Sequence, residues 1–263
     1  MKPHRSHTIA AALAALLAPG GAQALILVDS DDAGAAVYAD GWGLFDDGSV
    51  NPGSLGGWVL GGNASDPGTI DITSSTGLGA GGAIDSAGVA FKVHDTTGGF
   101  VDLFRFFDPD GLEAGQTFSM ELAVNFRGGF KGMDLRSDAG DATIFNFNIG
   151  GDDYTVSSAA TGNGSVGADY APDTVFSLSF TQVDLTGGTW SITRSGGVSD
   201  FDSGTYTGRA KSIKLYSGGQ GTAGEDAIYY NNFQVTEVPE PSTAALAGVG
   251  ALMAMSRRRR AVA

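Results

Sequence analysis

The feature that most constrains this chain is a strict alternation of apolar and polar residues over short runs. In residues 118–126, every second position is apolar, from Phe118 through Leu122 to Phe126. Successive side chains of a β-strand point to opposite faces, so this spacing buries one face and leaves the other in water. Residues 143–149 and 175–180 alternate in the same way. Between the two ends of the chain no run keeps the apolar spacing of an amphipathic helix, so the sequence predicts an all-β body.

About a dozen such runs, separated by Gly, Asp, Ser and Asn, lie between residues 25 and 238. This number of short strands predicts two packed antiparallel sheets, a β-sandwich of jelly-roll or concanavalin-like type. A β-helix and a two-domain β protein are the alternatives, although the fixed repeat of a β-helix is missing. The pair Gly187-Gly188 is predicted to form a hairpin turn. The residues predicted to fill the core are Phe118, Phe126, Phe145, Phe147, Phe176, Phe180 and Trp190.

The composition limits the chemistry that the chain can perform. It contains no cysteine, which excludes disulfides, thiol catalysis and zinc–thiolate sites. Its 42 glycines lack a three-residue period, so they indicate turns between strands rather than a collagen-like helix. The formal net charge is −14 at pH 7. A surface this acidic repels nucleic acids and anionic lipids, but it tolerates divalent cations and neutral glycans.

The carboxyl-terminal segment, residues 239–263, has three parts in a fixed order. Pro239, Glu240 and Pro241 come first, and an uncharged, largely apolar stretch follows at residues 243–255. The prolines mark the outer limit of a helix, because proline is not tolerated in a helix interior. The predicted transmembrane helix is short against the ~20 residues that cross a bilayer. The positive-inside rule keeps the final basic cluster cytoplasmic and the body outside. This cluster consists of Arg257, Arg258, Arg259 and Arg260.

This three-part segment resembles the PEP-CTERM sorting signal of exported proteins in Gram-negative bacteria that make exopolysaccharide. The resemblance implies that an exosortase, a membrane protease, recognises the segment and removes it after transient anchoring in the inner membrane. It implies a final location at the cell surface or in the extracellular matrix, with extracellular polysaccharide as a partner.

The amino-terminal residues also indicate export. Lys2 and Arg5 precede an apolar run at residues 8–18, and the small residues Ala22 and Ala24 follow it. A basic start, an apolar run and a small-x-small site are the parts of a secretory signal peptide. We therefore expect a signal peptide at residues 1–24, cleaved after Ala24 by the secretion machinery. A β-sandwich domain at residues 25–238 and the sorting tail at residues 239–263 complete the predicted organisation.

Aspartates in turns are the candidate ligands for a cation. Asp29 and Asp31 begin a sequence that partly imitates an EF-hand loop, but Ala33 occupies the fifth position. Many jelly-roll carbohydrate-binding modules hold a structural Ca²⁺ near their first and last strands. By that resemblance, Asp29, Asp31 and Asp226 are the predicted Ca²⁺ ligands. The alternative is that all three are ordinary solvated turn residues.

Two tryptophans are candidates for contact with a glycan. Trp42 and Trp58 lie in glycine-rich segments, which favours exposed loops. An exposed indole can stack on a sugar ring. The alternative is that both tryptophans belong to the core of the sandwich, because tryptophan is highly buried on average.

The sequence lacks a recognisable catalytic set. Once the leader is removed, His94 is the one histidine left in the sequence, and we expect it to be exposed at a strand end. The Glu-x-Asp-x-x-Glu string of concanavalin-like β-glucanases does not occur, and Glu121 is expected to face solvent. We therefore predict a structural or binding module associated with exopolysaccharide and not an enzyme. The alternative is a secreted carbohydrate-active enzyme of concanavalin-like fold.

Overall fold

The computed structural model describes residues 24–51, 54–78, 81–107, 109–137, 142–151, 154–166 and 174–238. Leu27–Glu237 form one compact unit. The predicted cleavage residue Ala22, the apolar tail helix and the sorting residues at positions 239–260 lie outside the described residues. Within the part of the chain that is described, no helix is both long and apolar enough to cross a membrane.

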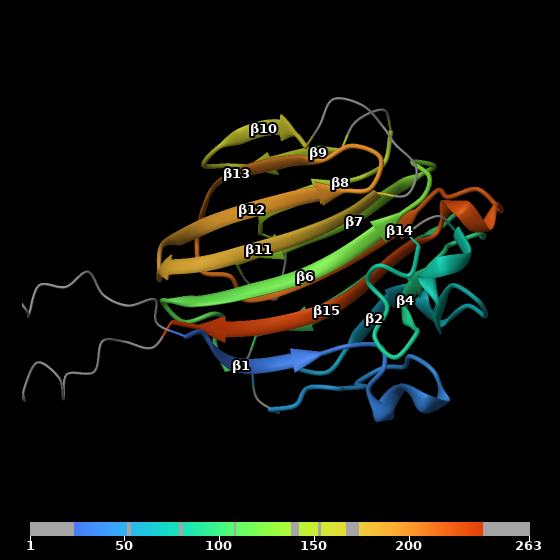
Figure 1. Ribbon diagram of the computed structural model, residues 1–263, viewed down its shortest axis with the longest axis horizontal. Helices are drawn as coiled ribbons and strands as arrows, with labels where there is room; N and C mark the ends of the chain where they lie inside the picture. The colour runs from blue at the N-terminus through green and yellow to red at the C-terminus, as the bar shows by residue number, and fades with distance from the viewer. Residues whose placement is uncertain are drawn as a thin grey trace, which may run out of the picture. The chain divides into compact units, whose positions relative to one another are not determined.

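The described residues of the body form two β-sheets, of which the first has eight strands. Its neighbours in order are β13 (Asp200–Thr207), β12 (Gly187–Ser195), β11 (Thr174–Asp184), β6 (Gln116–Val124), β15 (Ile228–Glu237), β4 (Ala90–Val93) and β3 (Ile70–Thr73). Strand β1 (Ile26–Asp31) also pairs with β15. Figure 1 shows β15, β6, β11 and β12 side by side.

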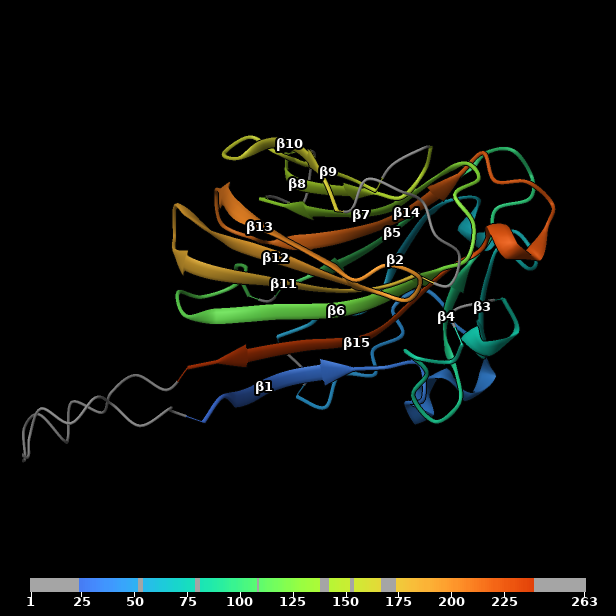
Figure 2. The same cartoon turned by 45° about the horizontal axis from the view of Figure 1, so that its top comes forward.

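The second sheet has seven strands in the part of the chain that the structure describes. Its order is β10 (Gly162–Ser165), β9 (Thr155–Ser158), β8 (Thr143–Asn148), β7 (Phe130–Arg136), β14 (Ser212–Gly218), β5 (Phe100–Phe106) and β2 (Val59–Gly62). The short 3-10 helices η2 (Ala36–Asp40), η3 (Asn63–Ser65), η4 (Ser75–Leu78) and η5 (Gly224–Asp226) lie between strands. Figure 2 shows the two sheets as separate layers. The predicted all-β antiparallel sandwich is therefore confirmed.

The core between the sheets comes from the alternation seen in the sequence. Along β11 and β12, inward residues are buried and most outward residues are partly or fully exposed. The predicted core residues Phe118, Phe145, Phe147, Phe176, Phe180 and Trp190 are all buried. Phe126 is the exception at 41% exposure, because β6 ends at Val124 and the alternation no longer applies beyond it.

Two further details lie at opposite ends of the first sheet. The hairpin between β11 and β12 turns at Leu185 and Thr186, so the predicted glycine turn is wrong and the glycine pair begins β12. A Cβ on Gly188 would come within 2.4 Å of the Tyr206 hydroxyl, which explains the glycine. Near the other end, on the outer face of this sheet, Ile84 covers a small apolar cluster that includes Ala123, Val175 and Tyr229. The middle of the face stays open.

Candidate functional site

The predicted glycan-binding tryptophans lie inside the protein. Trp42 and Trp58 are both buried, and their rings meet edge to face with centroids 5.1 Å apart. Trp58 also contacts Phe91 and Phe233, which belong to the first sheet. The prediction that these indoles stack on sugars from exposed loops is wrong, because the glycine-rich segments fold back against the core.

The predicted calcium ligands Asp29 and Asp31 are bonded to groups of the protein. The Asp29 carboxylate accepts hydrogen bonds from the backbone N–H groups of Ser30, Asn51 and Leu55, at 2.8, 3.0 and 3.0 Å. Asp31 forms an ion pair with Arg105 and accepts a hydrogen bond from the Tyr38 hydroxyl at 2.6 Å. Burial raises the pKa of Asp31, although Arg105 acts in the opposite direction.

Arg105 is the residue that organises this corner of the sandwich, and the sequence analysis missed it. It comes from β5 of the second sheet and reaches Asp31 on β1 of the first. Its guanidinium also donates to Asp47 and Ser49, both at 2.8 Å, and it lies 5.1 Å from the centre of the Trp58 ring. The alternation of β5 places Arg105 on the inward face, which was the available signal. The corner is therefore a structural link between the sheets.

Asp226 lies at a different place in the fold, beside a buried lysine. Its main-chain oxygen accepts hydrogen bonds from Lys131 Nζ and Gln220 Nε2, both at 2.6 Å. Burial lowers the pKa of Lys131 to about 8, against the attraction of the Asp226 carboxylate. No three His, Cys, Asp or Glu side chains of the described residues gather to hold a metal ion. The predicted three-aspartate calcium site is therefore wrong, because the carboxylates of Asp29, Asp31 and Asp226 do not come together.

His94 is buried, so its predicted exposure is also wrong. Its Nε2 lies 2.9 Å from the main-chain oxygen of Gly221. The neighbouring Asp95 carboxylate accepts hydrogen bonds from Thr97 and from Asn63. The contact with Gly221 ties the end of β4 to the loop before η5, which is a structural role.

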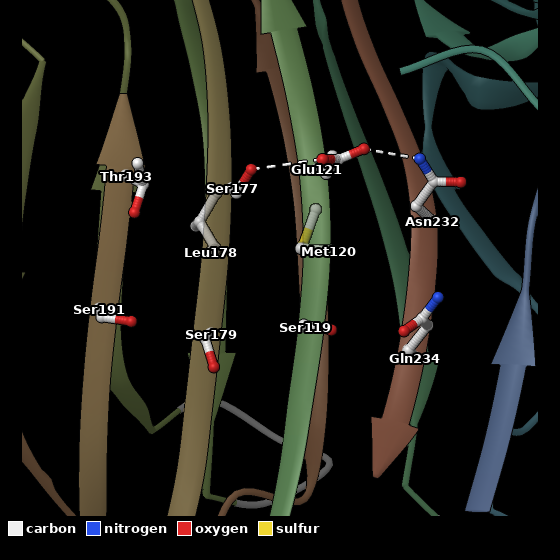
Figure 3. Close-up of a pocket in the computed structure, with 10 residues that line it drawn as sticks. All are labelled: Ser119, Met120, Glu121, Ser177, Leu178, Ser179, Ser191, Thr193, Asn232 and Gln234. Atoms are coloured by element: carbon white, nitrogen blue, oxygen red, sulfur yellow. Dashed lines mark hydrogen bonds between the residues drawn. The ribbon is translucent and has the colours of Figure 1, made fainter. Parts of the chain in front are cut away.

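An open polar surface lies on the outer face of the first sheet. A groove of about 380 Å³ crosses β12, β11, β6 and β15 there (Figure 3). It is lined by Ser119, Met120, Glu121, Ser177, Leu178, Ser179, Ser191, Thr193, Asn232 and Gln234. Most of these side chains carry a hydroxyl, an amide or a carboxylate, so the groove offers many donors and acceptors in a small area.

Strand register orders these groups into rows across the sheet. Ser191, Ser179 and Ser119 are direct neighbours on β12, β11 and β6. A second row on the same face lies two residues away along these strands and continues onto β13 and β15. It is made by Thr205, Thr189, Thr181, Thr117 and Thr236. The hydroxyls of Thr117 and Thr181 lie 2.8 Å apart. We call the groove and these two rows the hydroxyl face.

Glu121 is the charged residue among those that line the groove of the hydroxyl face. One carboxylate oxygen accepts from Asn232 Nδ2 at 2.6 Å, and the other accepts from the Ser177 hydroxyl at 3.3 Å (Figure 3). Asn232 has φ +56°, and the pairing of β15 with β6 shifts register between Asn231 and Gln234. Because of this bulge, the Asn231 side chain donates hydrogen bonds to the main-chain oxygens of Ile84 and Val89, whereas the Asn232 side chain donates to Glu121.

The shape of the hydroxyl face decides which ligands it can accept. Neighbouring strands of a sheet generally rotate by about 20–25° relative to one another, so the surface formed by the strands from β15 to β13 is twisted and not flat. A flat crystalline polysaccharide fits a twisted surface poorly. A single flexible chain with many hydroxyls can follow the twist and exchange hydrogen bonds along it.

Comparison with solved structures gives distant similarity to β-rich domains. The receptor-binding domain of botulinum neurotoxin type G matches with 9% identity and a TM-score of 0.38, over 68% of this chain and 42% of that domain. The chain thus spans less than half of the neurotoxin domains it matches. Domain 4 of the extracellular GH43 arabinanase AbnA from Geobacillus stearothermophilus, in complex with arabinotriose, matches with 16% identity and a TM-score of 0.42, over 80% of this chain and 94% of that one.

The galectin LEC-6 from Caenorhabditis elegans matches with 17% identity and a TM-score of 0.33, over 49% of this chain and 88% of the galectin. At this level of similarity no ligand or activity can be transferred to the chain. The class that the fold itself defines is a two-sheet antiparallel β-sandwich with an open polar outer face.

The carboxyl-terminal segment is assigned by its sequence. The family model of the PEP-CTERM protein-sorting motif matches residues 237–260. The chain therefore carries this motif, which confirms the resemblance seen in the sequence. The motif implies a protein that is exported, processed by an exosortase and located at the cell surface. No curated protein matches the chain.

Proposed function

We propose that this exported protein binds a neutral extracellular polysaccharide on its hydroxyl face, and that it is a binding module and not an enzyme. The observation that carries this proposal is Glu121, held between Asn232 and Ser177 in an open groove of hydroxyl and amide groups. A charged acceptor and planar amides are groups that bind pairs of sugar hydroxyls. The net charge of −14 favours an uncharged polymer over an anionic one.

The alternative function is a carbohydrate-active enzyme. Hydrolysis of glycosides generally requires two carboxylates placed on either side of the scissile bond. Among the described residues that line the groove, Glu121 carries the only carboxylate. This composition favours binding over turnover. Release of reducing ends from a polysaccharide by the purified protein would favour the enzyme instead.

Binding is tested by affinity electrophoresis against soluble arabinan, arabinoxylan, galactan, dextran and mixed-linkage β-glucan. We expect at least one polymer to retard the wild-type protein, and Glu121→Ala to weaken that retardation about tenfold. This loss corresponds to ~1.4 kcal/mol, at the lower end for a charged hydrogen bond. Glu113→Ala is the matched control, because Glu113 is exposed and pairs with Arg209 away from the groove. Equal binding by both variants would refute the proposal.

We further propose that the sorting tail is cleaved near Pro239–Pro241 after transient anchoring in the inner membrane, and that the body then joins the extracellular matrix. The match to the sorting motif supports this order of events. Intact-mass measurement of the protein recovered from outside producing cells tests it. We expect a mass without Arg257 to Arg260, and a surface form that retains them would contradict the proposal.

A further inference from the structure

The outer face of the second sheet differs in chemistry from the hydroxyl face. A groove of about 390 Å³ lies there, lined by Phe100, Asp102, Phe130, Asp134, Asn146, Lys214 and Tyr216. We call these residues the aromatic face. Because the two sheets pack through their inner faces, the aromatic face and the hydroxyl face lie on opposite sides of the sandwich.

Two phenylalanines on this face are about half exposed. Phe100 is 51% exposed and Phe130 is 48% exposed. Gly218 pairs with both of them across β5, β14 and β7. A Cβ on Gly218 would come within 2.2 Å of the Phe130 ring, and a Cβ on Gly62 within 2.9 Å of the Phe100 ring. Each ring therefore lies over a glycine of a neighbouring strand, and its other side faces solvent.

Hydrogen-bonding groups in fixed positions lie beside the two rings. Asn146 Nδ2 lies 2.7 Å from Asp134 Oδ1 and 2.9 Å from the Tyr216 hydroxyl oxygen. Lys214 Nζ lies 3.2 Å from Asp134 and 3.6 Å from Asp102, and 5.2 Å from the centre of the Tyr216 ring. Burial raises the pKa of Tyr216, so its hydroxyl remains a donor at any ordinary pH. Exposed rings beside a few fixed polar groups are typical of a binding site for a small or repeating ligand.

The charges on this face select the class of ligand. Asp102 and Asp134 are both paired with Lys214, so the face offers no uncompensated cation to an anionic polymer. The protein as a whole is acidic, which further disfavours anions. A sugar ring presents an apolar face of C–H groups and an edge of hydroxyls, which match the rings and the polar groups respectively.

We propose that the aromatic face is a second binding site for neutral polysaccharide, and that the protein bridges two polysaccharide chains through its opposite faces. The bridging rests on the proposed function of the hydroxyl face, whereas the second site stands on its own contacts. Because the two sites lie on opposite faces, they cannot both bind one short segment of a polysaccharide. A protein with both sites can therefore cross-link two polysaccharide chains.

The test uses the full chain and the five soluble polysaccharides named above. We measure affinity by electrophoresis and bridging by light scattering of the polymer as protein is added. The double variant F100A/F130A is expected to lower affinity about tenfold and to abolish the rise in scattering. Leu185→Ala, which removes an exposed apolar side chain at the β11–β12 turn, is the matched control and should scatter like the wild type. Melting curves show whether the double variant is folded. If it is not, the single variant F100A takes its place in the test.

The outcomes separate the two faces. Scattering by F100A/F130A equal to that of the wild type would overturn the proposal. Loss of affinity in F100A/F130A, with none in E121A, would leave the aromatic face standing and refute the hydroxyl face. A wild-type dimer in size-exclusion chromatography that becomes a monomer in F100A/F130A would show that a second copy of the chain covers this face, and would also overturn the proposal.

Discussion

The corner made by Asp29, Asp31, Trp58 and Arg105 differs from the hydroxyl face in how its polar groups are used. In the corner, Asp29, Asp31 and Arg105 are bonded to one another or to nearby backbone, and Trp58 packs beneath them. On the hydroxyl face, Ser177, Thr193 and Gln234 remain exposed in a groove. The comparison teaches that residue type alone identifies residues capable of binding a ligand, whereas the fold decides which of them are available.

The largest expected effect lies in the corner. Trp58→Ala should lower the free energy of unfolding by ~3–5 kcal/mol, because it opens a cavity beside Phe91 and Phe233. Chemical denaturation measures the change. Phe201→Ala, on an exposed position of β13, is the control and should have little effect. If Trp58→Ala kept wild-type stability but lost glycan binding, the distinction between the two regions would fail.

The next effect concerns the ion pair that joins the two sheets. Asp31→Asn should destabilise the protein by about 3 kcal/mol, because Arg105 keeps its buried charge but loses one carboxylate partner. Thermal melting compares this variant with Asp40→Asn, a change at an exposed position. Equal melting temperatures for the two variants would show that the corner is not a structural link.

Lys131, which lies beside Asp226, makes the free energy of unfolding depend on pH. Its pKa is about 8 in the folded protein, below the ordinary value of 10.5. Between these values the unfolded chain binds more protons, so stability rises with pH. We expect a gain of about 2 kcal/mol from pH 7 to 9.5. Tyr216 and Tyr230, whose pKa values are raised by burial, act in the opposite direction above pH 10.

Lys131→Met should remove most of this pH dependence without disrupting the loop, because Gln220 still donates to the Asp226 carbonyl. Chemical denaturation of the wild type and of Lys131→Met at several pH values measures this pH dependence. A variant with the same pH profile as the wild type would show that Lys131 titrates normally.

The smallest expected effect is that of calcium on the melting temperature. Asp29 and Asp31 already accept hydrogen bonds from the protein, and Asp226 lies apart from them. Melting curves with chelator and with added Ca²⁺ should therefore coincide. A shift of several degrees would mean that a cation binds the folded state, by the linkage that stabilises any liganded protein.

The alternation in the sequence predicted the strands and most of the core, because a period of two depends only on local geometry. It failed at Phe126, where the strand ends two residues earlier. The corner could not be predicted, because Arg105 and Asp31 are 74 residues apart and meet only when the sheets pack. The outward position of Glu121 was predicted, but its contact with Asn232 depends on a bulge that the sequence does not signal.

The most direct test of the account places a bulky side chain in the middle of the hydroxyl face. Ser179 lies in the groove on β11, between Ser191 and Ser119. Ser179→Trp should fill the groove and abolish polysaccharide retardation in a protein that lacks the aromatic-face rings, with an unchanged melting temperature. Val183→Trp, at the exposed end of the same strand, should bind like its parent. Undiminished binding by Ser179→Trp would contradict the claim that the ligand lies on this face.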